Sequence, residues 1–288
     1  MAQAETVLRP PPSLPAPRWA RVRRAPTLLV GTALLAIIVA AAAAAPVLTP
    51  YSASALDLRR TFEGPSRAHP LGTDNFGRDL LARLLYGARI DLMIGVFATA
   101  VTLVVGSALG LLAGYYGGRL DRLIMRIVDV VVAFPFFVLV IGLVAMLGTG
   151  LRNMFVAIWL VGWVSYARIV RGEVLFVRTR EYIEAARAIG LPDQRIIFRH
   201  VLPNAITPAI IFSMTDVVLN ILLGSSLSFL GLGAQPPAPE WGLMIAEGRT
   251  FLATAWWMSA LPGLAIVITG VAFSLIGDGL ADVLRPGG

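Results

Sequence analysis

Six apolar stretches, each about as long as a membrane-spanning helix, limit most strongly what this chain can fold into. A helix needs about 20 apolar residues to cross about 30 Å of hydrocarbon. Because backbone groups in hydrocarbon must pair within the chain, and because no alternation of period two points to a barrel, helices are predicted. The predicted spans are residues 27–48, 90–116, 124–147, 155–169, 205–230 and 257–280. The sequence therefore predicts an all-α polytopic membrane protein with six transmembrane helices.

The residue types that the chain lacks narrow the chemistry that it can perform. All 24 Lys and Arg residues are arginine, and no residue is cysteine. Without lysine, the chain cannot contain a Gly-x-x-x-x-Gly-Lys phosphate loop, so a partner must bind any ATP that is used. The arginines form no basic stripe of the kind that binds nucleic acid. His69 and His200 are far apart, so we expect two solvated histidines and no metal, cofactor or catalytic site in this chain.

The arginines are unevenly distributed between the two sides of the predicted membrane. Most of them fall on the side of the N-terminal tail, and positively charged loops stay in the cytoplasm, so both termini are predicted to be cytoplasmic. We divide the chain into a disordered cytoplasmic tail (1–26), the first span with an extracytoplasmic segment (27–89) and a five-helix core (90–288). A cleaved signal peptide is the alternative for the first span, but a signal's apolar core has only about 7 to 15 residues.

Two further patterns predict how helices begin and pack. Thr73 or Asp74 is expected to cap a helix whose leucines recur from Leu80 onward, and which lies on the outer surface or braces the bundle. In the second span, glycines recur every four residues, which lets another helix approach closely. These glycines are Gly106, Gly110, Gly114 and Gly118. We interpret them as a contact within the chain or between subunits.

Carboxylates within predicted spans are the candidates for a translocation pathway. A charge in hydrocarbon is unfavourable unless it faces a cavity, a partner or the bundle interior, which singles out Asp129 and Asp216. Phe134 and Asn220 are added as candidate lining residues. Asp129 could equally lie near the cytoplasmic face, and Asp216 could simply pair with an interior donor. Pro135 has no amide donor and should kink the third span near Phe134.

The predicted cytoplasmic loop at residues 181–204 is the most informative segment. Glu184 and the two alanines after it favour a short helix, and Gly190 suits the C-terminal cap of that helix. Asp193 could cap a second helix that leads into the fifth span. A rigid, alanine-faced helix outside the bilayer is suited to insertion into a groove on another protein.

This loop resembles the EAA loop of bacterial ABC importer permeases. The resemblance implies that its residues couple the permease to ATPase subunits; they are Glu184, Ala185, Ala186, Gly190, Leu202 and Pro203. Residues 69–79, 228–233 and 236–242 resemble the second permease subunit of dipeptide, oligopeptide and nickel importers. The chain departs from the family pattern at two positions. The family usually has an aliphatic residue at the position of His200, and relatives often carry an acidic residue near the position of Gly224.

The resemblance covers about residues 28–285 and implies a type I ABC importer permease fold in a bacterial inner membrane. The implied partners are a homologous second permease, two ABC ATPase subunits that bind ATP and Mg, an extracytoplasmic substrate-binding protein and membrane lipid. The proline-rich stretch before Trp241 is predicted to be extended and rigid with exposed aromatic area, which suits docking, and Pro237, Glu240 and Trp241 are the candidate docking surface for the binding protein. ATP binding would pull on the loop and switch the bundle from inward-open to outward-open. The expected function is import of dipeptides or oligopeptides; nickel chelates and glutathione stay open as solutes.

A proton-coupled secondary transporter that uses Asp129 or Asp216 is the alternative from another mechanistic class. Inverted repeats would support it, and we see no internal repetition between the two halves. It would also leave the alanine-faced loop without a role. A membrane enzyme is disfavoured because the sequence has no Gly-x-Ser-x-Gly or His-Glu-x-x-His motif and no lysine or cysteine nucleophile.

Overall fold

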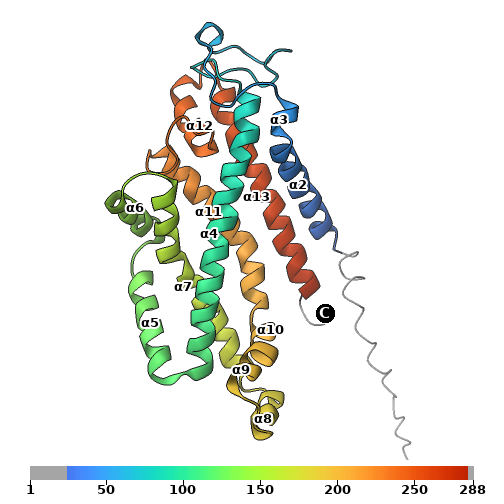
Figure 1. Cartoon of the computed structure of the whole chain (residues 1–288), viewed down its shortest axis with the longest axis vertical. Helices are drawn as coiled ribbons and strands as arrows, with labels where there is room; N and C mark the ends of the chain where they lie inside the picture. Colours follow the sequence, from blue (N-terminus) through green and yellow to red (C-terminus); the bar gives the residue numbers. More distant parts are fainter. Residues whose placement is uncertain (1–24, 285–288) are drawn as a thin grey trace, which may run out of the picture.

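The fold is an elongated bundle of long helices (Figure 1). The computed structural model describes residues 25–284, so almost all of the predicted tail (1–26) lies outside the described residues. Within these residues, five helices are long and apolar enough to cross a membrane, and the number is six if a bent helix pair counts as one span. The five helices are α2 (Pro26–Ala43), α4 (Leu80–Tyr116), α7 (Leu151–Val177), α11 (Thr207–Phe229) and α13 (Trp257–Leu284). The predicted all-α, polytopic fold is confirmed.

The third predicted span is broken rather than straight. α5 (Gly118–Val132) and α6 (Phe136–Leu147) are bent by 89° relative to each other. The break falls just before α6, where Pro135 has no amide hydrogen with which to continue α5 and instead precedes the first residue of α6. A change of direction near Phe134 was predicted, and the bend is far larger than the kink of a continuous helix.

α4 is one unbroken helix of 37 residues, although the sequence suggested a separate surface helix followed by the second span. The boundary drawn between residues 89 and 90 therefore falls inside it. Its cap was also predicted wrongly: the Asp79 carboxylate, rather than Thr73 or Asp74, accepts a hydrogen bond from the Ala82 amide at 2.7 Å. At about 1.5 Å per residue, α4 is about 55 Å long.

The glycines of α4 bring it against α7, so the predicted small-residue contact lies within the chain. A Cβ atom at Gly106 or Gly110 would collide with a backbone carbonyl oxygen of α7, and one at Gly114 would press on Val174. Gly118 belongs to α5 and has open space around it. Three of the four glycines therefore form the contact, and the fourth lies beyond it.

The first span is tied into the bundle. α2 packs along α13. Arg89 of α4 donates hydrogen bonds to the carbonyl oxygens of Ala42 and Ala43 at 2.7 and 3.2 Å. Carbonyl groups at the end of a helix have no partner within that helix, so Arg89 satisfies groups that would otherwise be unpaired. These contacts favour a retained transmembrane helix over a cleaved signal.

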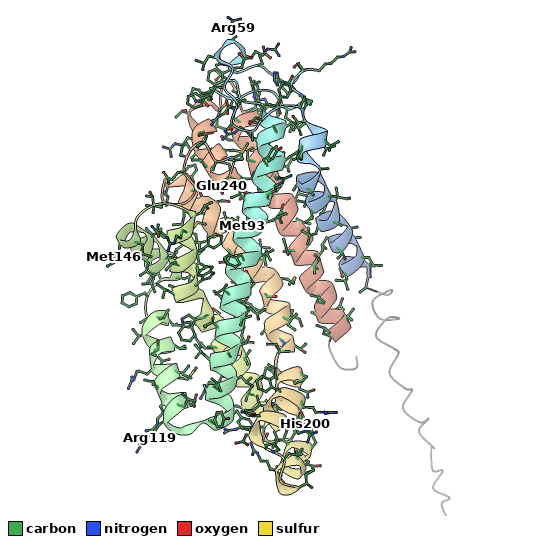
Figure 2. The ribbon with its side chains drawn as sticks, viewed as in Figure 1. Arg59, Met93, Arg119, Met146, His200 and Glu240 are labelled. Atoms are coloured by element: carbon green, nitrogen blue, oxygen red, sulfur yellow. The ribbon has the colours of Figure 1, made fainter. Side chains whose placement is uncertain are left out.

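The two ends of the bundle carry different structures. At one end lie α8 (Glu181–Ala188), α9 (Asp193–Ile196) and α10 (Leu202–Ala205), together with Arg119 and His200 (Figures 1 and 2). The opposite end carries α12 (Trp241–Gly248) and the segment at residues 49–79 (Figure 1). α2 begins and α13 ends toward the end that carries α8. The short elements are α3 (Ala45–Leu48), η1 (Leu58–Arg60), the π-helix η2 (Ile197–Val201) and η3 (Arg249–Phe251).

Candidate functional site

The loop at residues 181–204, called the coupling loop below, projects from one end of the bundle (Figure 1). α8 ends where Gly190 takes a φ of 77°, a left-handed conformation that glycine adopts without steric cost. The Gly190 amide donates to the Arg187 carbonyl at 2.9 Å, and the Leu191 amide donates to the Ala186 carbonyl at 3.2 Å. This is the hydrogen-bond pattern of a glycine cap. Gly190 therefore ends α8 as predicted.

The two faces of α8 have different surroundings. Ile183 and Ala186 are buried in a core that α8 shares with the nearby halves of α4 and α7. Glu184 and Ala185 are exposed on the other side of the helix. Of the remaining predicted coupling residues, Gly190 and Pro203 are exposed and Leu202 is half-buried. The six residues therefore do not form one surface, because Ala186 helps to hold α8 in place.

Large apolar side chains are exposed around the coupling loop. Ile189 is 76% exposed and Phe198 is 65% exposed, and Tyr182 of α8 is also exposed. Exposed apolar side chains of this size are the kind that another protein or lipid covers. The docking role of the loop stays a prediction.

The second helix of the coupling loop begins differently from the prediction. Asp193 is the first residue of α9, its side chain caps no helix, and Pro192 precedes the helix. The Asp193 carboxylate instead accepts a hydrogen bond from the Tyr115 hydroxyl, with an O–O distance of 2.6 Å. The predicted cap was wrong because a side chain of α4 competes for the carboxylate.

The candidate pathway residues fall into two separate places. Asp129 on α5 and Phe134 at the break before α6 are exposed on the surface of the chain. Asp216 is half-buried and Asn220 is buried, and both belong to α11. The structure therefore does not bring the two carboxylates together, and the pathway role of all four residues stays a prediction.

Asp216 belongs to a polar network in the bundle interior. The Tyr166 hydroxyl donates to Asp216 Oδ2 at 2.8 Å, and Asn220 Nδ2 lies 3.2 Å from the same oxygen. Asn220 Nδ2 also donates to the Thr99 hydroxyl at 2.9 Å. The network links α4, α7 and α11, as expected if Asp216 pairs with interior donors. Sequence reasoning missed Tyr166 and Thr99, since nothing in their local sequence marks them as partners of Asp216.

The predicted binding-protein docking surface is only partly available. Pro237 is exposed, but Glu240 and Trp241 are 0% and 2% exposed. The Glu240 carboxylate caps α12, accepting from the amides of Gly242 and Leu243 at 2.9 and 2.7 Å. The Trp241 indole donates to a backbone carbonyl of α4 at 3.1 Å. The predicted docking through Glu240 and Trp241 is therefore wrong: Glu240 caps α12, Trp241 joins α12 to α4, and of the three residues only Pro237 is exposed.

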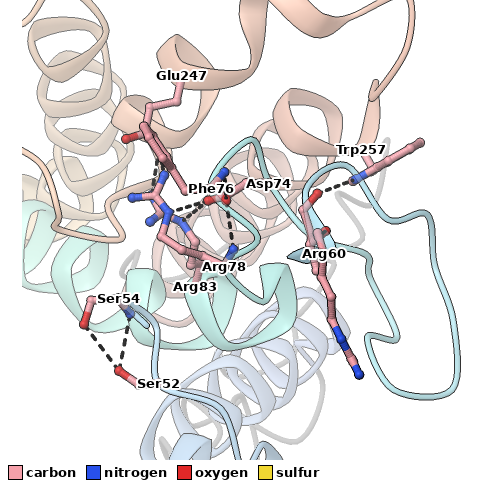
Figure 3. A network of polar contacts seen from close by, with 10 residues as sticks. Ser52, Ser54, Arg60, Asp74, Phe76, Arg78, Arg83, Glu247 and Trp257 are labelled. Carbon is pink, nitrogen blue, oxygen red and sulfur yellow. Dashed lines mark hydrogen bonds and ion pairs between the residues drawn. The ribbon is translucent and has the colours of Figure 1, made fainter. Parts of the chain in front are cut away.

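A buried ionic cluster holds the 49–79 segment to α4 and α12 (Figure 3). Arg78 Nε lies 2.5 Å from Asp74 Oδ2, and Arg78 Nη2 lies 2.7 Å from Glu247 Oε2. Arg83 Nη2 donates to the same Glu247 oxygen at 2.9 Å. Two guanidinium groups thus face two carboxylates, which balances the buried charge. The charged residues were visible in the sequence, but their pairing with Glu247 joins positions more than 160 residues apart.

His69 lies at the same end of the bundle as α12 and is not solvated, contrary to the prediction. It is 4% exposed, and its Nδ1 lies 2.8 Å from Asp79 Oδ2, so the residue that caps α4 also orients the imidazole. Among residues 25–284, no group of three or more His, Cys, Asp and Glu side chains is arranged to hold a metal ion.

Comparison with known proteins identifies the family. A family model described as binding-protein-dependent transport system inner membrane component matches residues 106–287. The chain belongs to this family. A second model, the N-terminal TM domain of oligopeptide transport permease C, matches residues 18–65 of the permease. The resemblance inferred from the coupling loop is thereby confirmed, and the family leaves the proton-coupled alternative without support.

Relatives of nearly full length agree with this assignment. The permease is 44% identical to the glutathione transport system permease protein GsiD of Pectobacterium atrosepticum, over 93% of this chain and 89% of that one. It is 39% identical to the dipeptide transport system permease protein DppC of Alkalihalophilus pseudofirmus, over 98% and 97%. Its fold is similar to a chain of the inward-facing MetNI methionine ABC transporter, with a TM-score of 0.58 and 20% identity over 70% of this chain and 96% of that one. The permease is a multi-pass inner-membrane protein of the ABC importer type.

Proposed function

We propose that this permease forms one half of the transmembrane pathway of an ATP-driven importer for short peptides, with glutathione included in that class. The observation that carries the proposal is the similarity, over nearly the whole chain, to permeases named for glutathione and dipeptide transport. A putative peptide transport system permease of Brucella suis, 42% identical over 92% of this chain and 90% of that one, points to the same class of solute. Dipeptides and glutathione share peptide bonds and charged ends.

The proposed complex contains a homologous second permease, two ABC ATPase subunits that bind ATP and Mg, and an extracytoplasmic binding protein. Ile189 and Phe198 support an ATPase contact, because a protein groove would cover these exposed apolar side chains. The break between α5 and α6 supports a second permease, because Phe134, Phe136 and Phe137 are exposed there. No lysine is present to complete a phosphate loop, so ATP hydrolysis is assigned to the partners.

The proposed cycle uses the coupling loop to move the bundle. ATP binding draws the two ATPase subunits together, and α8, which is seated on them, moves with them. Ile183 and Ala186 anchor α8 in the core shared with α4 and α7, so displacement of α8 changes the packing of those helices. ATP and solute then favour different positions of the coupling loop, and such a difference is what coupling between the two ligands requires.

The distribution of the arginines supports an orientation that can be tested directly. We propose that both termini and the coupling loop are cytoplasmic and that the 49–79 segment and Pro237 face outward. The chain has no cysteine, and Gln194 and Pro237 are exposed, so each can carry a single Cys. In intact spheroplasts, Pro237→Cys should react with an impermeant maleimide, whereas Gln194→Cys should react only after lysis. The opposite labelling pattern would reject the orientation.

Uptake by cells tests the solute class. Deletion of the gene should abolish binding-protein-dependent uptake of a labelled dipeptide, of labelled glutathione, or of both, and the wild-type gene should restore it. Uptake of a labelled sugar serves as the control for membrane energisation and should not change. Undiminished uptake of both peptides in the deletion strain, with no second importer for them present, would exclude the proposed solute class.

A further inference from the structure

The chain that leads from the coupling loop into α11 is irregular. The π-helix η2 occupies residues 197–201, and such turns replace the regular α-helical hydrogen bonds. Pro203 and Pro208 then remove two amide donors, and the helix is interrupted at Ile206. Helices bend readily where regular hydrogen bonds are missing. The chain segment that joins the coupling loop to α11 is therefore suited to act as a hinge.

A side-chain route connects the same loop to α4. Tyr115 lies in the last turn of α4 and donates its hydroxyl hydrogen bond to Asp193 at 2.6 Å. The guanidinium of Arg187 lies 5.3 Å from the centre of the Tyr115 ring. The ring itself is buried, in the core that contains Ile183 and Ile196. One side chain of α4 thus contacts both α8 and α9.

α4 is continuous over its whole length, so a displacement at one end of the helix also moves the other end. It runs without a break from Leu80 to Tyr116 and packs on α7 through its glycines. At its other end, Asp91 Oδ2 accepts a hydrogen bond from the Trp241 amide at 3.1 Å, and Arg83 pairs with Glu247 at 2.9 Å. Both partners belong to α12, so α4 joins the coupling loop to the end of the bundle that carries α12.

We propose that Tyr115 is a positioning residue that fastens the coupling loop to α4 through its hydrogen bond to Asp193. Movement of the loop is then passed to α4 and α7 as one unit, while the irregular segment at residues 197–206 allows α11 to move separately. The inference rests on the proposed function, because it assumes that ATPase subunits move the loop.

A distance measurement tests the contact without transport. Spin labels at Leu112→Cys on α4 and Gln194→Cys on α9 report the separation between α4 and the coupling loop in the purified full-length permease. The wild-type background should give one narrow distance distribution, and Tyr115→Phe should broaden it, because the ring stays and only the hydroxyl is removed. Tyr116→Phe is the matched control: its side chain adjoins Tyr115 in sequence but is exposed, so the distribution should stay narrow.

ATP hydrolysis by the reconstituted complex tests whether the Tyr115–Asp193 contact is needed for coupling. Tyr115→Phe should lower solute-stimulated ATP hydrolysis about ten-fold, as expected for loss of a hydrogen bond to a charged group, while basal hydrolysis and copurification of the ATPase subunits persist. Asp193→Ala should lower the stimulation equally, and the double variant should lower it no further than either single variant. If Tyr115→Phe accumulates poorly, Asp193→Ala alone tests the contact. A narrow distribution and wild-type stimulation in both single variants would overturn the inference. If the wild-type complex shows no stimulation, the proposed function fails, while the spin-label distances still decide whether the contact fastens the loop.

Discussion

Glu184→Lys should abolish peptide import while the permease still inserts in the membrane at the wild-type level. Glu184 is exposed on α8, so the new lysine needs no space in the core. In the proposed complex the substitution places a positive charge against whatever cationic group the carboxylate meets on the ATPase subunit. Loss of one partner of a charged interface pair commonly costs about 2–5 kcal/mol. Solute-stimulated ATP hydrolysis and uptake by the reconstituted complex measure the effect.

Gly190→Val should produce the same loss by a different physical cause. Gly190 has a φ of 77°, and a Cβ atom there would have open space around it, so the substitution acts through backbone strain alone. That strain is about 1–2 kcal/mol for a residue with a side chain, and it should displace the end of α8.

Two substitutions separate coupling from a general disturbance. Gly142→Val in α6 is the control for Gly190→Val, because it also has open space but no left-handed conformation. Glu184→Gln controls the charge reversal, since it keeps the size of the side chain and should retain part of the stimulation. If Glu184→Lys and Gly190→Val both keep wild-type stimulation and transport, the loop is not the coupling element.

Asp74→Ala should cause the largest loss of stability among single substitutions at the end of the bundle that carries α12. Asp74, Arg78 and Arg83 are each no more than 2% exposed, and removal of the carboxylate leaves two buried guanidinium groups with only Glu247 to pair them. Breaking a buried ion pair in this way costs about 3–5 kcal/mol. Asp74 Oδ1 also accepts hydrogen bonds from the amides of Phe76 and Arg78, which would lose their partner. Thermal unfolding of the purified permease in detergent should show the loss.

Asp57→Ala provides a comparison within the same segment. The Asp57 side chain is 51% exposed and lies 3.8 Å from Arg60, and exposed pairs of this kind contribute at most about 1 kcal/mol. Limited proteolysis should therefore cut the 49–79 segment faster in Asp74→Ala than in Asp57→Ala. Equal unfolding temperatures for Asp74→Ala and the wild type would mean that the ionic cluster does not hold this segment in place.

The features that sequence reasoning predicted correctly are local ones. Pro135 disrupts its own helix because it has no amide hydrogen, whatever surrounds it. Gly190 ends α8 because the left-handed conformation is accessible to glycine in any context. The glycine stripe predicted a close helix contact, since small side chains permit it, but not that α7 would be the partner.

The features that it missed depend on residues far away in the chain. Trp241 looked like an exposed docking residue because prolines precede it, yet its indole donates to a carbonyl of α4. Asp193 looked like a helix cap, yet the Tyr115 hydroxyl, 78 positions away, takes its carboxylate. A carboxylate or an indole has several possible partners, and its local sequence does not say which one is within reach.

By itself, the sequence determined that the chain is a helical membrane protein, roughly where its apolar runs lie and where α8 ends. Those properties follow from the length of the apolar runs and from the conformational limits of proline and glycine, which act within a few residues. Only the tertiary structure decided that α4 is a single helix from the coupling loop to the end that carries α12, that Asp216 pairs with Tyr166, and that Arg78 and Arg83 share Glu247. Buried charges and polar groups must find partners of the right geometry, and the packing of distant helices decides which partners are available.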